Sequence, residues 1–373
     1  PMTPKETPRR ILENADNTFE KTFGQKAILT TKAHARVNLI GEHTDYTGGY
    51  VLPCLLPYKT TISVADNKSS NEFNVYSELF DEKVSFSDFI RSKDNRWTDY
   101  IKGCLSVFFD VNPQLEIAYL NILINTSIPI GRGIASSSAL CVAILKMLRN
   151  YFGIRYNNNQ IAILAHKVER NYVGVSGGIM DQMVSSIGIH GKALFLNCLT
   201  HKYELIDLPN NHRFELIDSN IQRDNRNSAY NDRHNQLKKA ENIIDVDNLG
   251  TVTIDQLDKS LFTDNLIYKR ALHVVTENQR TVCAKKFMLK NDMSRFGNLM
   301  NLSHTSYSQD FEASSPEIDL LVQRSIESGA IGSRLTGGGF GGFTVSLIEK
   351  QNYDDWYKNM RTFYPEERFF EIH

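Results

Sequence analysis

The residues best suited to carry chemistry lie in segment 36–46, which reads RVNLIGEHTDY. It places Arg36, Glu42, His43 and Asp45 around a short apolar core. Side chains with many hydrogen-bond donors and acceptors, close together on a loop, suit a polyhydroxylated ligand, because a buried polar group left unpaired is costly. One histidine with two spaced carboxylates does not make a convincing metal-ligand set. An exposed charged turn is the alternative interpretation.

A second candidate is segment 128–139, IPIGRGIASSSA, which follows a strand-like run and opens a helix-like stretch. Its glycines permit positive φ angles and close approach to a ligand. Serines at a helix start, with unpaired amides and the helix dipole, form an anion site. A Walker A loop fails because no lysine follows the glycines, and a dinucleotide fingerprint fails because Ser136 stands where the third glycine belongs. A serine-rich triphosphate loop and a plain helix N-cap remain open.

A third candidate is Asp181, which lies between apolar residues after a glycine pair in segment 177–182, GGIMDQ. A semi-buried carboxylate is expensive unless it is paired or functional. Taken alone this is a weak signal, and an ordinary turn aspartate explains it equally well.

The elements that must position these residues mix strands and helices without regular βαβ spacing, which predicts an α+β fold. β-Branched and aromatic residues or apolar periodicity predict the elements. The expected strands are 27–33, 59–66, 72–76, 116–125, 193–197, 214–218 and 343–348, and the expected helices are 140–151, 161–172 and 228–244, with further helices up to about residue 331. A soft boundary near residue 205 divides an N-terminal lobe, 1–205, from a C-terminal lobe, 206–373.

Composition excludes several partners. Lys plus Arg (42) nearly balance Asp plus Glu (43), so no net positive field attracts nucleic acid or an anionic membrane. The five cysteines have no CxxC spacing, which favours buried free thiols over disulfides or zinc. Residues 1–10 are polar and unlike a signal peptide, and the apolar run 139–148 contains Lys146 and is too short to span a bilayer. A cytoplasmic protein is expected.

Together these segments resemble the galactokinases, of the GHMP (galactokinase, homoserine, mevalonate, phosphomevalonate) kinase superfamily. Residues 36–53 resemble the signature RVNLIGEHTDYNGGYVLP, with Thr47 in place of Asn, and 129–139 resemble the phosphate loop P-x-G-x-G-L-S-S-S-A, with Ile134-Ala135 in place of Leu-Ser. Residues 332–343, GSRLTGGGFGGF, resemble the third motif. Weaker matches are GIMDQ at 178–182, S-x-Y-N-x-R at 228–233 and W-x-x-Y-x-K-G at 97–103.

The resemblance implies a two-lobed fold with the active site between the lobes, and phosphorylation of galactose by ATP at its anomeric hydroxyl. It implies a role for each matching residue. The catalytic residues would be Asp181 and Arg36; the sugar-binding residues Glu42, His43, Asp45, Gly178 and Tyr230; the nucleotide-binding residues Gly133, Ser136, Ser137, Ser138, Trp97, Tyr100, Gly338 and Gly339; and the Mg²⁺ ligands Ser137 and Glu169. For Trp97 and Tyr100, two core aromatics on one helix face is an equally good interpretation.

Two departures from the family pattern carry predictions. His34-Ala35 replaces Pro-Gly before Arg36, and alanine cannot take positive φ cheaply, so ordinary extended geometry is expected at Ala35. Phe343 replaces a frequent cysteine and is expected in the core.

The alternatives are a kinase for N-acetylgalactosamine or galacturonate, and a catalytically silent homologue that senses sugar. Galactose is favoured because Glu42 would repel a uronate, and retention of Asp181, Arg36, Glu169 and 136–139 speaks against silence. A monomer that acts on small molecules is expected.

Overall fold

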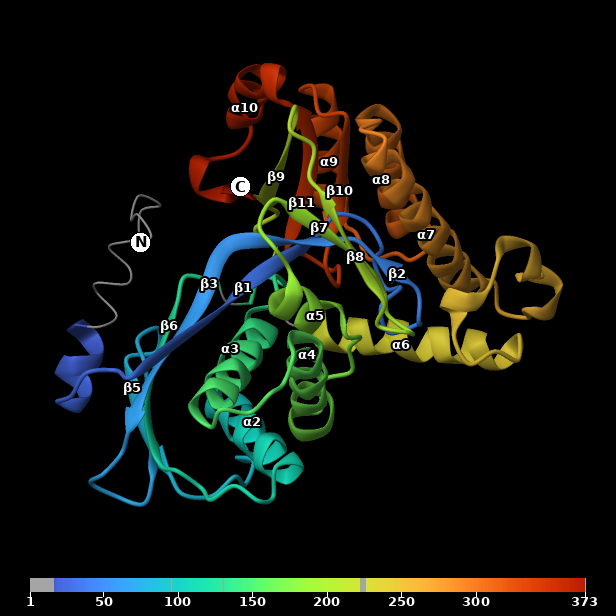
Figure 1. The fold of residues 1–373 in the computed structure, drawn as a ribbon. Coiled ribbons are helices and arrows are strands. Elements are labelled where there is room, and N and C mark those ends of the chain that lie inside the picture. Colours follow the sequence, from blue (N-terminus) through green and yellow to red (C-terminus); the bar gives the residue numbers. More distant parts are fainter. Residues whose placement is uncertain (1–16, 95, 130, 222–225, 373) are drawn as a thin grey trace.

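The computed structural model describes residues 17–94, 96–129, 131–221 and 226–372, with the side chains of 226 and 227 left out. Most of the described chain belongs to two sheets and the helices packed on them (Figure 1). The strands are β1 (Leu29–Asn38), β2 (Tyr50–Val51), β3 (Pro53–Asp66), β4 (Phe73–Ser77), β5 (Glu82–Phe86), β6 (Leu120–Thr126), β7 (Lys192–Asn197), β8 (Tyr203–Asp207), β9 (His212–Asp218), β10 (Gly332–Thr336), β11 (Phe343–Glu349) and β12 (Phe369–Glu371). The helices are α2 (Thr98–Val111), α3 (Ser136–Tyr151), α4 (Asn158–Lys167), the π-helix η1 (Val168–Val173), α5 (Met180–Ile187), α6 (Arg226–Ile243), α7 (Asn265–Leu289), α8 (Met293–Gln309), α9 (Pro316–Glu327) and α10 (Tyr353–Arg361). Short 3₁₀ turns are η2 (Leu249–Thr251), η3 (Ile254–Gln256), η4 (Lys259–Leu261), η5 (Lys350–Asn352) and η6 (Glu366–Arg368).

The larger sheet has eight strands and carries the first half of the chain. Its order is β2-β7-β3-β6-β4-β5, with β1 on β3 and β8 on β7, and of its pairs only β4–β6 is parallel. Helices α2 to α5 cluster below the long strands β1 and β3 in Figure 1, and α3 and α5 contact both strands. The sheet thus supports the helix starts that hold the phosphate-loop serines and Asp181.

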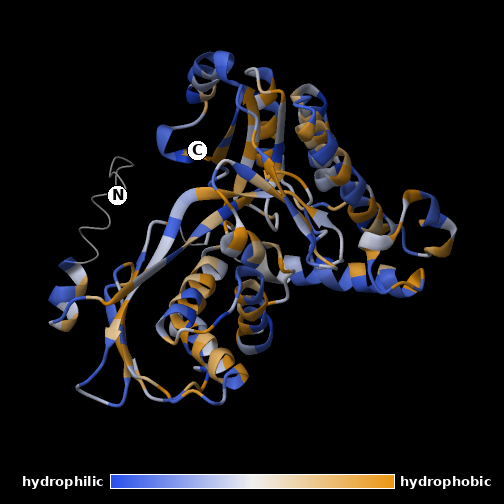
Figure 2. Ribbon diagram, in the orientation of Figure 1, coloured by the Kyte–Doolittle hydropathy of each residue, from blue (hydrophilic) through white to orange (hydrophobic). Residues whose placement is uncertain are grey.

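The smaller sheet, β10-β11-β9-β12, is antiparallel and packs against α8 and α9. Val37 of β1 and Phe343 of β11 belong to the same hydrophobic cluster, so the core is continuous between the sheets. A second cluster joins α6, α7 and α8. Figure 2 shows α6 as mostly hydrophilic and α3 as rich in apolar residues, consistent with an exposed α6 and a buried α3.

The predicted α+β class is confirmed, and several element boundaries are corrected. β1 continues beyond the expected residue 33 to Asn38, and β3 begins at Pro53 instead of residue 59. β6 begins at Leu120, four residues after the expected start. The helix expected at 161–172 changes into the π-helix η1 after Lys167. Strand propensity alone did not reveal these limits, because pairing between β1 and β3 continues through the polar residues His34, Arg36 and Asn38 of β1 and through the proline-containing start of β3.

The expectations for the two departures are confirmed. Ala35 lies within β1 and is absent from the residues with positive φ, although the register with β3 shifts between His34 and Arg36. Phe343 is 1% exposed and packs edge-to-face against Phe370.

The division of the chain at residue 205 stays a prediction. Residue 205 lies inside β8, which pairs with β7 of the larger sheet, and the next strand, β9, belongs to the smaller sheet. The change of sheet therefore falls between Asp207 and His212.

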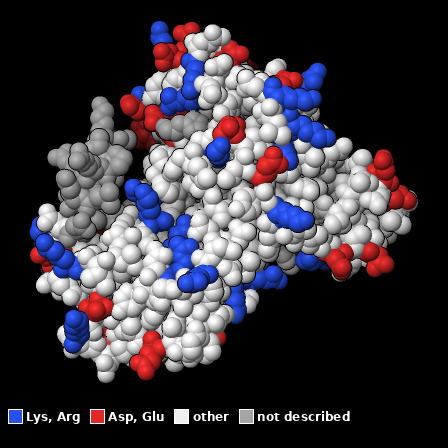
Figure 3. Space-filling view, viewed as in Figure 1, with Lys and Arg blue, Asp and Glu red and all other residues white. Residues whose placement is uncertain are grey.

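The distribution of charges on the surface and the state of the cysteines match what the composition predicted. Charges of both signs are spread over the face shown in Figure 3. All five cysteines are free, and four of them are buried, with Cys283 only partly so. Within the described ranges, no helix is both long and apolar enough to cross a bilayer. Ile130 of the phosphate-loop motif and the polar segment 1–10 lie outside the described residues.

Candidate functional site

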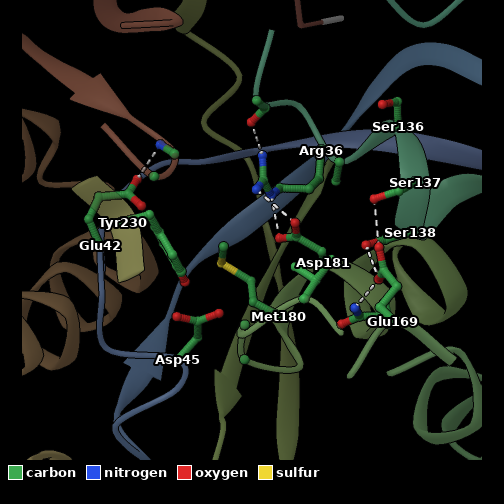
Figure 4. A pocket seen from close by; sticks show the side chains of 18 of the residues that line it. Arg36, Glu42, Asp45, Ser136, Ser137, Ser138, Glu169, Met180, Asp181 and Tyr230 are labelled. Atoms are coloured by element: carbon green, nitrogen blue, oxygen red, sulfur yellow. Dashed lines mark hydrogen bonds and ion pairs between the residues drawn. The ribbon is translucent and has the colours of Figure 1, made fainter. Parts of the chain in front are cut away.

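One cavity of about 420 Å³ brings the three candidate segments together. Its volume lies in the range of small-molecule sites. Residues from both sheets and from α3, η1, α5 and α6 line it (Figure 4). The lining includes most of the predicted site residues: Arg36, Glu42, His43, Asp45, Gly133, Ser136, Ser137, Ser138, Glu169, Gly178, Asp181, Tyr230, Gly338 and Gly339.

The centre of the cavity is a two-point ion pair between Arg36 and Asp181. Arg36 Nε donates to Asp181 Oδ1 at 2.7 Å and Nη2 donates to Oδ2 at 3.0 Å. Burial by itself lowers the pKa of Arg36, but the Asp181 carboxylate outweighs burial and the pKa is raised. Asp181 stands in the first turn of α5, where the helix dipole favours a carboxylate. The pair therefore carries a fixed cation beside an acceptor that is still 27% exposed toward the cavity.

The phosphate loop has the backbone geometry that an anion site requires. Gly131, Gly133 and Ala135 all have positive φ, of 74°, 78° and 64°. The first-turn amides of a helix have no acceptor within the helix. At α3 no side chain caps them, because Ala135 stands at the N-cap position, so these amides are open to a ligand. The Gly133 carbonyl accepts Arg36 Nη1 at 2.9 Å, which fixes the loop beside the ion pair. This geometry favours the triphosphate interpretation over a plain N-cap.

Glu169 belongs to the π-helix η1, and its side chain reaches the first turn of α3. Its carboxylate accepts hydrogen bonds from Ser137 Oγ at 2.6 Å, Ser138 Oγ at 2.7 Å and Gln182 Nε2. Burial raises the pKa of Glu169, opposed by these hydrogen bonds. π-Helical turns commonly occur at functional sites.

These residues suit Mg²⁺. A carboxylate with one or two hydroxyls, completed by substrate phosphates and water, is the usual magnesium environment. Gln182 Oε1 is buried without a hydrogen-bond partner, which leaves an unused oxygen acceptor beside Glu169. Among the residues that the structure describes, no group of three or more His, Cys, Asp or Glu side chains is arranged to hold a metal ion.

On the opposite wall, Glu42 is locked in place by the third motif. Its Oε1 accepts from Arg334 Nη1 at 3.0 Å, the Gly337 amide at 3.0 Å and Thr336 Oγ1 at 3.2 Å. Burial raises the pKa of Glu42, against the opposing effect of Arg334. Glu42 and Arg334 are 3% and 0% exposed, so the pair is withdrawn from solvent.

The Asp45 carboxylate packs directly against the backbone of Gly178. A Cβ added at Gly178 would overlap the Asp45 carboxylate, so only glycine fits there. Burial and the nearby Asp181 raise the pKa of Asp45 to about 7. In Figure 4, Asp45, Tyr230, Met180 and Asp181 surround one common space.

His43 is held by protein partners on both ring nitrogens. Its Nδ1 is 2.7 Å from the Tyr46 hydroxyl and its Nε2 is 2.9 Å from the Tyr307 hydroxyl. The Tyr307 hydroxyl donates to the Gly337 carbonyl, so its oxygen is the acceptor for His43 Nε2–H. Burial lowers the pKa of His43 well below its ordinary value, and the ring is neutral at pH 7. A hydrogen bond from His43 to a hexose stays a prediction.

Trp97 and Tyr100 do not line the cavity, and a contact with adenine stays a prediction for both. Trp97 donates from Nε1 to Glu82 at 2.7 Å and stacks on Phe80. Burial, with a smaller effect of the charge of Glu169, raises the pKa of Tyr100 to about 12.

A buried charge network that the sequence did not predict lies behind Glu42. Glu277 of α7 accepts the amides of Gly41 and Glu42 at 2.9 and 3.2 Å, and Arg280 at 2.7 Å. Arg334 lies 3.6 Å from the same carboxylate. Arg334 stands in the third motif and was available to sequence reasoning, whereas Glu277 lies in a long amphipathic helix without any local signal.

Comparison with known proteins agrees with this geometry. Three family models match: the galactokinase galactose-binding signature at residues 17–66, the GHMP kinases N terminal domain at 99–188 and the GHMP kinases C terminal model at 284–366. The fold and site thus define a GHMP kinase. The galactokinase of Fusobacterium nucleatum is 34% identical over 97% of this chain and 96% of its own length, and that of Clostridium acetobutylicum is 34% identical over 97% and 95%. The chain belongs to the galactokinase family.

Solved structures show the same relationship. The structure of Lactococcus lactis galactokinase complexed with galactose has a TM-score of 0.91 and 29% identity, covering 97% of this chain and 98% of that one. Methanococcus jannaschii mevalonate kinase, with a TM-score of 0.66 and 17% identity over 92% and 98%, shares the fold.

Proposed function

We propose that this protein is an ATP-dependent galactokinase, which transfers the γ-phosphoryl group of ATP to O1 of α-D-galactose. The products are galactose 1-phosphate and ADP, and the reaction belongs to galactose catabolism by the Leloir pathway. The observation that carries the proposal is the Arg36–Asp181 pair, which shares one cavity with the open amides of α3. An acceptor for a hydroxyl proton and a seat for a triphosphate thus lie within one cavity.

The sugar is assigned to the wall formed by Glu42, Asp45, Gly178 and Tyr230. Carboxylate oxygens and a phenol hydroxyl supply the partners that closely spaced sugar hydroxyls need. We assign His43 to this wall as well, where its neutral ring orients Tyr46 through their hydrogen bond. Gly178 keeps the backbone close enough for the Asp45 carboxylate to stay in the cavity.

The nucleotide is assigned to Gly133 and Ser136–Ser138, with Gly338 and Gly339 closing the far side and Trp97 and Tyr100 toward the adenine. Ser137 and Glu169 would hold Mg²⁺, which when bound neutralises charge on the phosphates. Glu169 also orients the serine hydroxyls by accepting from both Ser137 and Ser138.

Proton transfer is expected to come late in the reaction. A sugar hydroxyl is many pKa units weaker an acid than an ordinary carboxylic acid, and each unit costs about 1.4 kcal/mol. Full deprotonation ahead of transfer is therefore too expensive. Asp181 instead takes the proton as the O1–phosphorus bond forms, while Arg36, fixed by its two bonds to Asp181, offsets the charge that builds up.

A coupled assay of ADP release with several hexoses tests the proposal. Galactose should give the highest kcat/KM, with N-acetylgalactosamine and galacturonate far lower, since the acidic side chains Glu42 and Asp45 disfavour a uronate. Turnover of another sugar in preference to galactose would identify a related kinase. Binding of sugar and ATP without turnover would identify a sensing homologue.

We also propose a cytoplasmic monomer that acts on small molecules. The free, mostly buried thiols support a reducing compartment. Size-exclusion chromatography with light scattering tests the monomer.

A further inference from the structure

Arg132 of the phosphate loop has no role in the function proposed above, although it lines the cavity. It stands between Gly131 and Gly133, both with positive φ. Its Nη1 lies 2.5 Å from Asp218 Oδ2, and its side chain is 30% exposed whereas that of Asp218 is 7% exposed. The pair connects the loop before α3 with the end of β9, and so joins the larger sheet's loop to the smaller sheet.

Asp218 is a fixed anchor. It pairs with Phe343 in the β9–β11 register, its Oδ1 accepts the Asn220 amide at 2.8 Å and its carbonyl accepts Arg368 Nε at 2.6 Å. A carboxylate held in this way sets the direction of the guanidinium that it binds. A guanidinium has five N–H donors, which is more than one carboxylate oxygen accepts, so donors remain for a ligand in the cavity.

Acidic side chains outnumber basic ones in the lining of the cavity, so a bound polyanion needs a cation such as Arg132. Four acidic side chains line it, namely Glu42, Asp45, Glu169 and Asp181. Over the described part of the chain, the lining contains no lysine, and Arg36 and Arg132 are its two arginines. Arg36 is engaged in both of its hydrogen bonds with Asp181. A triphosphate that enters this acidic cavity is therefore met by Arg132 as the cation on the loop itself.

We propose that Arg132, held at the cavity wall by Asp218, binds the β- and γ-phosphates of ATP. It takes the place that a lysine has in a Walker A loop, but as a planar, multidentate donor. The proposal rests on the proposed function, since it needs ATP phosphates on this loop.

The test compares binding of ATP, ADP and AMP to the full chain by calorimetry with Mg²⁺ present and galactose absent, so that no phosphoryl group is transferred during the titration. The KM for galactose comes from the coupled assay of ADP release. Arg132→Gln removes the charge and keeps a polar side chain of similar reach. It should weaken ATP binding about 10- to 100-fold, since hydrogen bonds to charged groups have that value. AMP binding and the KM for galactose should stay within about twofold of wild type. Arg132→Lys, which keeps the charge without the fork, should bind ATP more tightly than Arg132→Gln.

Arg213→Gln is the matched control, because Arg213 also lies on the β9 side of the molecule, is 26% exposed and pairs with a carboxylate, Glu215, outside the cavity. It should bind ATP as wild type does. Unchanged ATP affinity in Arg132→Gln, or equal losses for ATP and AMP together with a lower melting temperature, would assign Arg132 a structural role only and overturn the inference. A wild-type chain that binds no ATP would instead refute the proposed function.

Discussion

The chemistry at the scale of single residues depends on how two carboxylates in one cavity are compensated. Asp181 has a guanidinium partner with two hydrogen bonds, whereas Asp45 lies close to Asp181 without a comparable cation. One carboxylate therefore serves as an acceptor of fixed geometry, and the other changes protonation near neutral pH.

Replacement of the proposed base gives the first prediction. Asp181→Asn should lower kcat by at least about 10³-fold while the dissociation constant of galactose changes by less than about tenfold, because the amide fills the same space but cannot take the proton. Single-turnover kinetics and calorimetry with galactose measure the two quantities. Near-normal turnover in this variant would remove Asp181 from the role of base.

Asp45 gives a prediction for the pH dependence of stability. Its pKa is raised from 3.8 to about 7 in the folded chain, so the native state binds this proton more tightly than the unfolded state. The free energy of unfolding should therefore fall as pH rises from about 4 to about 7. Asp45→Asn removes this dependence, and the variant should gain stability relative to wild type between pH 5 and pH 8.

Urea titrations at several pH values measure this effect. Glu215, whose pKa is raised to about 7 mainly by burial, adds a similar slope in both proteins, so the difference between them reports on Asp45. The exposed Asp247→Asn serves as the control and should follow the wild-type profile. An Asp45→Asn variant that loses stability in parallel with wild type from pH 5 to 8 would contradict the prediction.

At the scale of elements, the site depends on irregular backbone where helices begin. The start of α3 is strained, because Ala135 has φ of 64° and ψ of 42°, a conformation that costs alanine about 1–2 kcal/mol. The π-turn η1 places Glu169 against this start. The strained start of α3 thus lies beside the open amides and the carboxylate that the reaction needs.

Relief of this strain is measurable. Ala135→Gly should raise the free energy of unfolding by about 1 kcal/mol, since glycine takes positive φ without a steric cost. Ala139→Gly, in the same helix but at a buried interior position, is the opposite control and should lower it by about 1 kcal/mol or more. Urea unfolding of both variants gives the values. A loss of stability in Ala135→Gly would show that the positive φ is not a source of strain.

At the scale of the whole molecule, the site is complete only where distant segments meet. Glu42 and Arg334 pair across 292 residues of chain, and Glu277 of α7 binds the amides of the same loop. The fully buried Arg334 thus connects the third motif to the sugar wall. Its Nη2 lacks a hydrogen-bond partner, so the network tolerates one incomplete contact.

Replacement of Arg334 should lower the free energy of unfolding of the whole protein. Arg334→Met leaves Glu42 buried without its cation and should cost about 3–5 kcal/mol of unfolding free energy. Arg295→Met is the control, because Arg295 is 71% exposed and its Nε lies 3.5 Å from Asp292 Oδ2 in a surface ion pair. This replacement should cost less than about 1 kcal/mol of unfolding free energy. Thermal and urea unfolding measure both, and equal effects would show that the buried network adds nothing.

Local sequence was enough for the fold class, most strands and helices, and the three motifs, because side-chain periodicity and loop chemistry are local properties. It also placed Phe343 in the core and extended backbone at Ala35, since bulk and the steric cost of positive φ belong to a single residue. The resemblance of the motifs to a family then named about half of the residues that line the cavity.

Only the tertiary structure decided which charges compensate one another. Arg36 against Asp181, Arg132 against Asp218 and Glu277 behind Glu42 are pairs between segments far apart in the chain. Burial and the distance between charges determine the pKa of each group, and neither quantity exists until the chain has folded. For that reason the sequence by itself determined the parts of the site, and the packing of the two sheets determined how those parts are charged and held.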